Sequence, residues 1–175
     1  MPHVLPEIYV RRVGMDARRA YLFAGSLRFP CVLGRAGRSW SKREGDGATP
    51  IGSMPVRRLW WRADKVKRPR TSLPMRPISE HDLWCDAPAD RNYNRHIRSP
   101  YQASHEKMRR ADDMYDLVLE LGWNERPCIK GRGSAIFLHV ARPGFRPTEG
   151  CVALRRTDLE KLLPWIGPET RVVVE

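Results

Sequence analysis

Long apolar runs are lacking in this sequence of 175 residues. No stretch approaches the roughly 18 apolar residues that a membrane-spanning helix needs, so no membrane span is expected. Residues 1–14 also lack the apolar segment of a secretory signal peptide. Three readings stay open on this point: the mature chain begins here, a leader has been removed, or export is unconventional.

Closely spaced cysteines are lacking as well. The chain has four cysteines, at Cys31, Cys85, Cys128 and Cys151. They form no Cys-x-x-Cys pair and no cysteine–histidine pair at zinc-binding spacing, so the sequence predicts no metal site. A disulfide between two of them stays open for an oxidising compartment.

Acidic residues are in deficit, with 20 Asp+Glu against 32 Lys+Arg and a formal net charge of +12. Such a field attracts polyanions, which include nucleic acid, anionic lipid and acidic cell-wall polymers. The basic run at residues 65–70 has no nucleic-acid-binding motif beside it, so no specific nucleic acid partner is predicted. A charge that serves only solubility is the alternative reading.

Repeats and low-complexity segments are lacking too, and the length fits one domain over residues 1–175. Alternating or β-branched apolar residues predict strands over much of the chain. The expected strands are Glu7–Val13, Arg18–Phe23, Leu27–Leu33, Ser53–Arg62, Asp116–Leu121, Ser134–Val140 and Thr170–Val174. The fold class is therefore mainly β, with one or two short helices.

Two helices are expected. Thr157 and Glu160 have the spacing of a capping box, which predicts a helix from Thr157 to about Trp165. A second, short helix is expected near the end of residues 91–110. Glycine and proline predict loops at Ser41–Gly52 and at Arg68–Pro77.

The segment with a chemical signature runs from residue 134 to residue 154. His139 ends an apolar strand, and a short loop leads back to Gly150 and Cys151. A glycine before a cysteine lets the backbone take a positive φ, which presents the thiol and leaves amides for an oxyanion. A neighbouring imidazole then accepts the thiol proton. The alternative is a buried, inert cysteine and a structural histidine.

Three motifs together resemble the L,D-transpeptidase (YkuD) family. Strand-borne His139, a loop, Thr148-x-Gly150-Cys151 and a helix resemble its catalytic segment. Residues 45–52 are similar to its Gly-x-x-x-Thr-Pro-x-Gly loop, and Tyr93–Asn94 falls where such domains often carry a Tyr-Asn pair near the substrate cleft. The resemblance is strongest over residues 40–175.

This resemblance implies a β-sandwich-like catalytic domain that acts on peptidoglycan stem peptides in the periplasm or cell envelope. Cys151 would form a thioester with a stem-peptide carbonyl, and the amine of a neighbouring stem would resolve it. His139 would be the base and Gly150 part of the oxyanion-hole turn. No metal or organic cofactor would be needed, and the oligomeric state is left open.

Substrate contacts are assigned to five residues beside these three. Arg142 on the loop can bind a stem carboxylate, because arginine recognises carboxylates bidentately, although a solvated loop charge is equally compatible. Thr148, Glu149, Tyr93 and Asn94 complete this set by resemblance.

Three departures from the family pattern surround the donor side of Cys151. Glu149 stands where most relatives have histidine, Ala153 stands where they often have arginine, and the Val140–Gly150 loop is shorter. We therefore expect either the usual 3→3 cross-link or a 1→3 link from L-Ala to diaminopimelate, with the second favoured by these changes. Two rival functions remain, an L,D-carboxypeptidase or endopeptidase with the same site, and a basic wall-binding or nucleic-acid-binding module with an inert cysteine.

Overall fold

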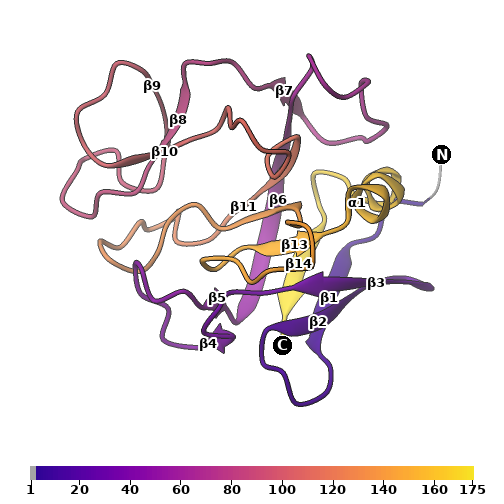
Figure 1. Cartoon of the computed structure of the whole chain (residues 1–175). Coiled ribbons are helices and arrows are strands. Elements are labelled where there is room, and N and C mark those ends of the chain that lie inside the picture. Colours follow the sequence, from indigo (N-terminus) through magenta and orange to yellow (C-terminus); the bar gives the residue numbers. More distant parts are fainter. Residues whose placement is uncertain (1–2) are drawn as a thin grey trace.

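The computed structural model describes residues 3–175, and most of its regular structure is strand (Figure 1). The strands are β1 (Glu7–Arg12), β2 (Arg19–Ala24), β3 (Leu27–Val32), β4 (Arg38–Ser39), β5 (Thr49–Pro50), β6 (Gly52–Trp61), β7 (Met75–Pro77), β8 (Asp82–Cys85), β9 (His96–Arg98), β10 (His105–Lys107), β11 (Leu117–Leu121), β12 (Phe137–Val140), β13 (Val152–Leu154) and β14 (Arg171–Val174). One α-helix, α1 (Arg156–Leu162), and the 3-10 helix η1 (Leu163–Trp165) follow β13.

The largest sheet closes on itself through its longest strand, β6. Its order is β11-β12-β13-β3-β2-β1-β14-β6, and β6 also pairs with β11. β6 uses residues 52–55 for β14 and residues 56–61 for β11. Each strand of this ring is therefore hydrogen-bonded on both sides, which makes the ring a stiff frame. β7 extends it along the end of β6, while β8, β9 and β10 form a separate small sheet.

The main hydrophobic core draws side chains from every strand of the ring and from α1. A second cluster lies between the ring and the small sheet, and it contains Trp60, Trp84, Tyr115 and Phe137. Successive side chains of a strand point to opposite faces. β12 accordingly gives alternate residues to the two clusters, and Phe137 belongs to the second one. The outer face of β12 thereby becomes a wall of the candidate site.

The mainly β prediction with one or two short helices is confirmed, and the pairings add that the large sheet is closed. The hairpin turn after β2 lies where expected, with β3 starting at Leu27. One of the two predicted helices is absent. Residues 91–110 hold the strands β9 and β10, which pair with β8, and no helix. Within residues 68–77, expected to be irregular, Met75–Pro77 forms β7.

The helix predicted from Thr157 to about Trp165 is present as α1 and η1, but the capping box predicted at its start does not form. The residue that caps α1 is Arg155, without a side-chain bond, and Thr157 lies inside the first turn. Arg156, the first helical residue, forms an ion pair with the buried carboxylate of Asp116. This contact between distant segments lies at the first helical residue, one position ahead of Thr157. Pro164 lies in the 3-10 helix that ends it.

Candidate active site

Parallel pairing of β12 and β13 brings the two ends of the catalytic segment together. Leu138 faces Val152 and His139 faces Ala153 in the ladder, so Cys151 lies beside Phe137. The amide of Phe137 donates to the Cys151 sulfur over 3.4 Å. The 141–151 connection is therefore the crossover that a parallel pair needs. It returns the cysteine to the strand that carries the histidine.

The turn before Cys151 requires glycine. Gly150 is buried with φ +140°, and a Cβ there would meet the carbonyl oxygen of Ala48 at 2.8 Å. Thr49, fully buried in the Thr-Pro-x-Gly loop, accepts from the Gly34 amide and donates weakly to the Cys151 carbonyl over 3.5 Å. The 45–52 loop thus supports the nucleophile turn from behind.

His139 is buried and oriented by its own backbone neighbour. Its Nδ1 lies 2.9 Å from the carbonyl oxygen of Val140. A carbonyl can only accept, so Nδ1 carries the proton and Nε2 is left as the acceptor. The Tyr115 ring packs edge-on against the imidazole, with centroids 5.4 Å apart. Burial lowers the pKa of His139 to about 4, against the raising effect of the Val140 carbonyl, and the ring is therefore neutral near pH 7.

The thiol of Cys151 is bound to the backbone in this structure. It donates to the Ala135 carbonyl oxygen over 3.3 Å, and Ala135 itself has φ +52°. Burial raises the pKa of Cys151 to about 12, and the Glu106 carboxylate adds to the rise, while the Phe137 amide lowers it. The Cys151 side chain is consequently a thiol and the His139 imidazole is neutral, so the two do not form an ion pair.

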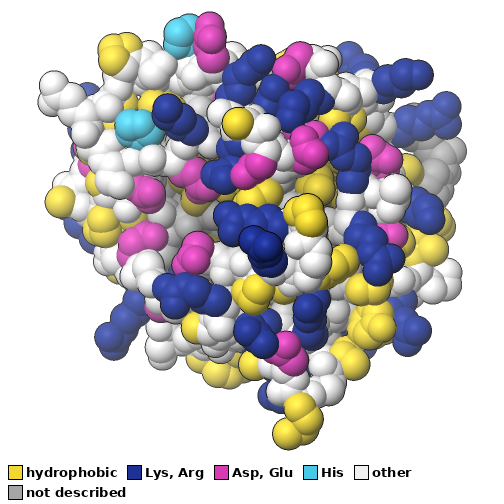
Figure 2. Space-filling model, in the orientation of Figure 1, with side chains coloured by type: hydrophobic (Ala, Val, Ile, Leu, Met, Phe, Trp, Pro, Cys, Tyr) yellow, Lys and Arg dark blue, Asp and Glu magenta, His cyan; other side chains and the backbone are white. Residues whose placement is uncertain are grey.

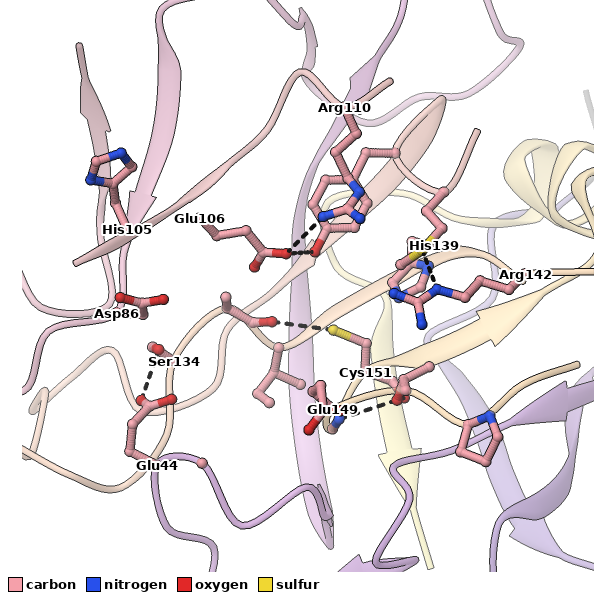
Figure 3. A pocket seen from close by; sticks show the side chains of 18 of the residues that line it. Glu44, Asp86, His105, Glu106, Arg110, Ser134, His139, Arg142, Glu149 and Cys151 are labelled. Atoms are coloured by element: carbon pink, nitrogen blue, oxygen red, sulfur yellow. Dashed lines mark hydrogen bonds and ion pairs between the residues drawn. The ribbon is translucent and has the colours of Figure 1, made fainter. Parts of the chain in front are cut away.

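Cys151 and His139 line the same cavity of about 430 Å³ (Figure 3). Gly150, Thr148, Glu149 and Arg142 also belong to its lining. Six of the eight residues assigned from the sequence are thereby brought to one cavity.

Tyr93 and Asn94 lie behind this cavity and not in its lining. The Tyr93 hydroxyl donates to Glu44 and accepts from the Gly133 amide over 3.0 Å. Asn94 Oδ1 accepts from the Ala135 amide over 3.1 Å, and its Nδ2 donates to the carbonyls of residues 123 and 124. The pair holds residues 133–135, the segment whose Ala135 carbonyl binds the thiol. Contact of either side chain with substrate stays a prediction.

The other assigned residues make the following contacts. Thr148 Oγ1 donates to the Cys151 carbonyl over 2.6 Å and accepts from the Gly150 amide over 3.1 Å, so it shapes the turn. Glu149 is exposed and forms an ion pair with Arg35 at 2.9 Å. Arg142 is exposed at the cavity, with Nε 2.9 Å from the sulfur of Met114.

The sequence analysis missed several residues of the cavity lining, among them Glu44, Glu106, Arg110 and Tyr115. Glu106 accepts from the Tyr115 hydroxyl over 2.6 Å, and Arg110 lies 3.8 Å from the same carboxylate oxygen. No spacing in residues 91–110 marks Glu106, because β10 is three residues long and its position depends on pairing with β8. Arg155 and Arg156, near the place where relatives carry arginine, lie outside the cavity lining.

The Cys151 thiol, directly before β13, and the neutral His139 imidazole on β12 line one cavity, and such a pair can support acyl transfer by a cysteine nucleophile. The model of the L,D-transpeptidase catalytic domain family (YkuD) matches residues 15–174. The chain therefore belongs to this family, whose enzymes act on peptidoglycan. No curated protein and no solved structure matches it. Within residues 3–175, no helix is long and apolar enough to cross a membrane.

Proposed function

We propose that this chain is a peptidoglycan L,D-transpeptidase that joins stem peptides through a thioester at Cys151. The observation that carries the proposal is the orientation of His139. Its Nδ1 is engaged by the Val140 carbonyl, which leaves Nε2 to take the proton of a thiol at the same cavity. The Val140 backbone carbonyl is thus the third group of the proposed site, because it orients the His139 imidazole.

In the first half-reaction, the thiol leaves the Ala135 carbonyl and gives its proton to Nε2 of His139. The sulfur attacks a stem-peptide carbonyl, a C–S bond forms, the amide C–N bond breaks, and the leaving amine takes the proton from His139. The amide of Gly150 is already donated to Thr148. The Cys151 amide is therefore the donor of this turn that we assign to the oxyanion.

Arginines at the mouth of the cavity suit the carboxylates of a stem peptide. Arg142 and Arg146 are both exposed and line the cavity on the loop between β12 and β13. Arginine binds carboxylates through two parallel hydrogen bonds. We assign Arg142 to the donor stem. Thr148 and Glu149 then affect substrate binding indirectly. Thr148 shapes the same loop, and Glu149 gives it a negative charge.

The donor bond that we favour is the one after the first L-Ala, which gives a 1→3 link. Ala153 is 1% exposed in the ladder opposite His139, so its position offers no cation to the donor. Glu149 is paired with Arg35 and presents an acid where most relatives present histidine. Donor choice depends on contacts that hold one carbonyl near attack distance. Tandem mass spectrometry of purified dimers distinguishes the links, and exclusively 3→3 dimers would exclude this choice.

Hydrolysis of stem peptides is the second candidate, because water can resolve the same thioester. An inert, basic wall-binding module is the third. Incubation with sacculi followed by mass spectrometry of the muropeptides separates them: new dimers indicate transpeptidation, shortened stems indicate hydrolysis, and an unchanged profile indicates binding alone. Cys151→Ala is the control in which neither product is expected. Action on this polymer would place the chain in the periplasm or cell envelope.

A further inference from the structure

Glu106 on β10 is a carboxylate with one engaged oxygen and one free oxygen at the active-site cavity. The Tyr115 hydroxyl and the Arg110 guanidinium both approach Oε1, at 2.6 and 3.8 Å. Within the part of the chain that the structure describes, no hydrogen bond is made to Oε2. Figure 3 shows this carboxylate pointing into the space beside the Cys151 sulfur.

The carboxylate is fixed relative to both reacting side chains. Its charge raises the pKa of the Cys151 thiol, which places it within electrostatic reach of the sulfur. The Tyr115 ring that holds it packs against the ring of His139 and, at 5.9 Å, against Phe137. Glu106 is thus held in place by the same residue that packs against the base.

The surroundings of Glu106 favour a cation. Asp86 lines the same cavity with a buried Oδ1 that has no hydrogen-bond partner among residues 3–175, and its charge raises the pKa of Glu106. Glu44 lies on this wall as well, bound by the Ser134 hydroxyl at 2.8 Å. Arg142 and Arg146 lie on the loop between β12 and β13. This wall holds the three carboxylates of Glu44, Asp86 and Glu106 against the guanidinium of Arg110, and such an excess of negative charge attracts a positively charged group.

We propose that Glu106 selects the acceptor, by receiving the side-chain ammonium of the incoming stem peptide next to the thioester at Cys151. The inference rests on the proposed transpeptidase function and adds to it a residue for the second half-reaction. The donor and acceptor stem peptides then lie on oppositely charged sides of one cavity. The donor carboxylates face Arg142, and the acceptor ammonium faces Glu106.

The same carboxylate can remove the first acceptor proton. Burial raises the pKa of Glu106, which makes this carboxylate a better acceptor of a proton from the ammonium than an exposed glutamate would be. The amine nitrogen attacks the thioester carbonyl, a C–N bond forms and the C–S bond breaks. The second proton passes from the nitrogen through His139 to the leaving sulfur, and Glu106 returns its proton to water.

The test measures the ratio of two products of the Cys151 thioester, the cross-link formed with an amine and the acid formed with water. The full chain is acylated with a donor stem peptide, the acyl-enzyme is followed by intact-protein mass spectrometry, and an acceptor tripeptide with a free side-chain amine is added. For Glu106→Gln we expect acylation that is unchanged or faster, since a charge that raises the thiol pKa is gone. The ratio of cross-linked to hydrolysed product should fall about tenfold, equal to about 1.4 kcal/mol.

Glu125→Gln is the matched control. Glu125 has a side-chain exposure of 31%, against 29% for Glu106, and it lines a different cavity. This variant loses the same charge and should keep the wild-type product ratio. An unchanged ratio in Glu106→Gln would overturn the proposal. A parallel loss of acylation and aminolysis would assign Glu106 to the support of Tyr115 and overturn it too.

A measurement on the wild type covers the case in which Glu106→Gln does not fold. An acceptor with a dimethylated amine keeps the positive charge and cannot form the amide, whereas an acetylated acceptor is neutral. We expect the dimethylated analogue to inhibit cross-linking at least tenfold more strongly, as a charge-assisted contact implies. Equal inhibition would overturn the proposal. Failure of the wild type to form any acyl-enzyme would instead exclude the transpeptidase function itself.

Discussion

The thiol of Cys151 donates to the carbonyl oxygen of Ala135 over 3.3 Å, and not to the imidazole of His139 on the adjacent strand. In the proposed mechanism, the thiol must therefore leave Ala135 and turn to Nε2 of His139 before it attacks. A bound substrate that displaces the thiol from Ala135 would favour this rotation.

Cys151→Ala should abolish cross-linking and leave the fold intact. The substitution removes two weak hydrogen bonds of the sulfur, with Phe137 and Ala135, and the packing of one small atom against the second cluster. The free energy of unfolding should therefore change by no more than about 1 kcal/mol. Muropeptide analysis and thermal unfolding measure the two effects. Residual cross-linking in this variant would end the assignment of Cys151 as the nucleophile.

His139→Gln should lower the acylation rate by about two to four orders of magnitude, the range for loss of a general base. In the wild type the rate should be nearly level from pH 5 to 8 and fall as the pH approaches 4, because the folded pKa of His139 is about 4. A rate step near pH 6.5, the ordinary histidine value, would contradict the burial of this ring.

The same residue links stability to pH. The pKa of His139 is lowered on folding, so the unfolded chain binds the extra proton first. Stability is complete above the unfolded pKa of about 6.5 and is lost as the pH falls toward 4, by up to about 3 kcal/mol. Urea unfolding of the wild type and of His139→Gln between pH 4 and 7 isolates this contribution. Parallel curves would contradict it.

Gly150→Ala should destabilise the nucleophile turn and abolish activity. A Cβ at Gly150 would approach the Ala48 carbonyl oxygen to 2.8 Å, and φ is +140°. Gly144→Ala is the control, since Gly144 also has a positive φ, +74°, but its Cβ would meet nothing within 4 Å. We expect a loss of about 2 kcal/mol or more for the first and about 1 kcal/mol for the second. Equal losses would show that conformation alone, and not the approach of Ala48, requires the glycine.

Asn94→Ala should lower kcat while KM stays near the wild-type value, because the Asn94 side chain holds the segment that positions Cys151. The change leaves four groups without a partner, on Trp84, Ala135, Trp123 and Asn124. The free energy of unfolding should fall by about 1–3 kcal/mol. A raised KM with unchanged kcat would instead support a direct substrate contact.

Asn92→Ala is the matched control for this prediction. The Asn92 amide donates to the Tyr101 hydroxyl, away from residues 133–135. Its loss should leave both kinetic constants near the wild-type values.

Binding to sacculi should weaken with salt and depend on one loop. Figure 2 shows Lys and Arg side chains gathered at the upper right, over the loop between β6 and β7 and beside α1. Lys67, Arg68 and Arg70 of this loop are exposed and line a groove of about 430 Å³ with α1. Exposed charges are screened beyond about 10 Å at 0.1 M salt. Changing the three to glutamine should reduce both the affinity and its salt dependence in a sacculus pull-down.

A control variant removes three positive charges from a different part of the surface. Arg91, Arg126 and Lys130 are exposed and lie outside that groove. If their glutamine variants weaken sacculus binding as strongly, net charge and not the loop accounts for the affinity.

Local sequence was sufficient to predict the strands around His139 and the turn at Cys151. Alternation of apolar residues and the conformational freedom of glycine are properties of a few neighbouring residues. It was insufficient for Glu106 and Tyr115, since these reach the cavity only through pairing of β10 with β8 and packing against Phe137. The prediction of a capping box at Thr157 failed for a similar reason. It used local spacing alone, which cannot show the Arg156–Asp116 ion pair between distant segments.

The parallel ladder of β12 and β13 makes the relative position of Cys151 and His139 independent of the loop that connects the two strands. Its register fixes Cys151 against Phe137 and His139 against Ala153, whatever path the 141–150 crossover takes. Residues can be inserted into or deleted from that crossover without changing the alignment of nucleophile and base. We therefore expect changes in the crossover to alter which peptides are accepted while the placement of Cys151 relative to His139 stays the same.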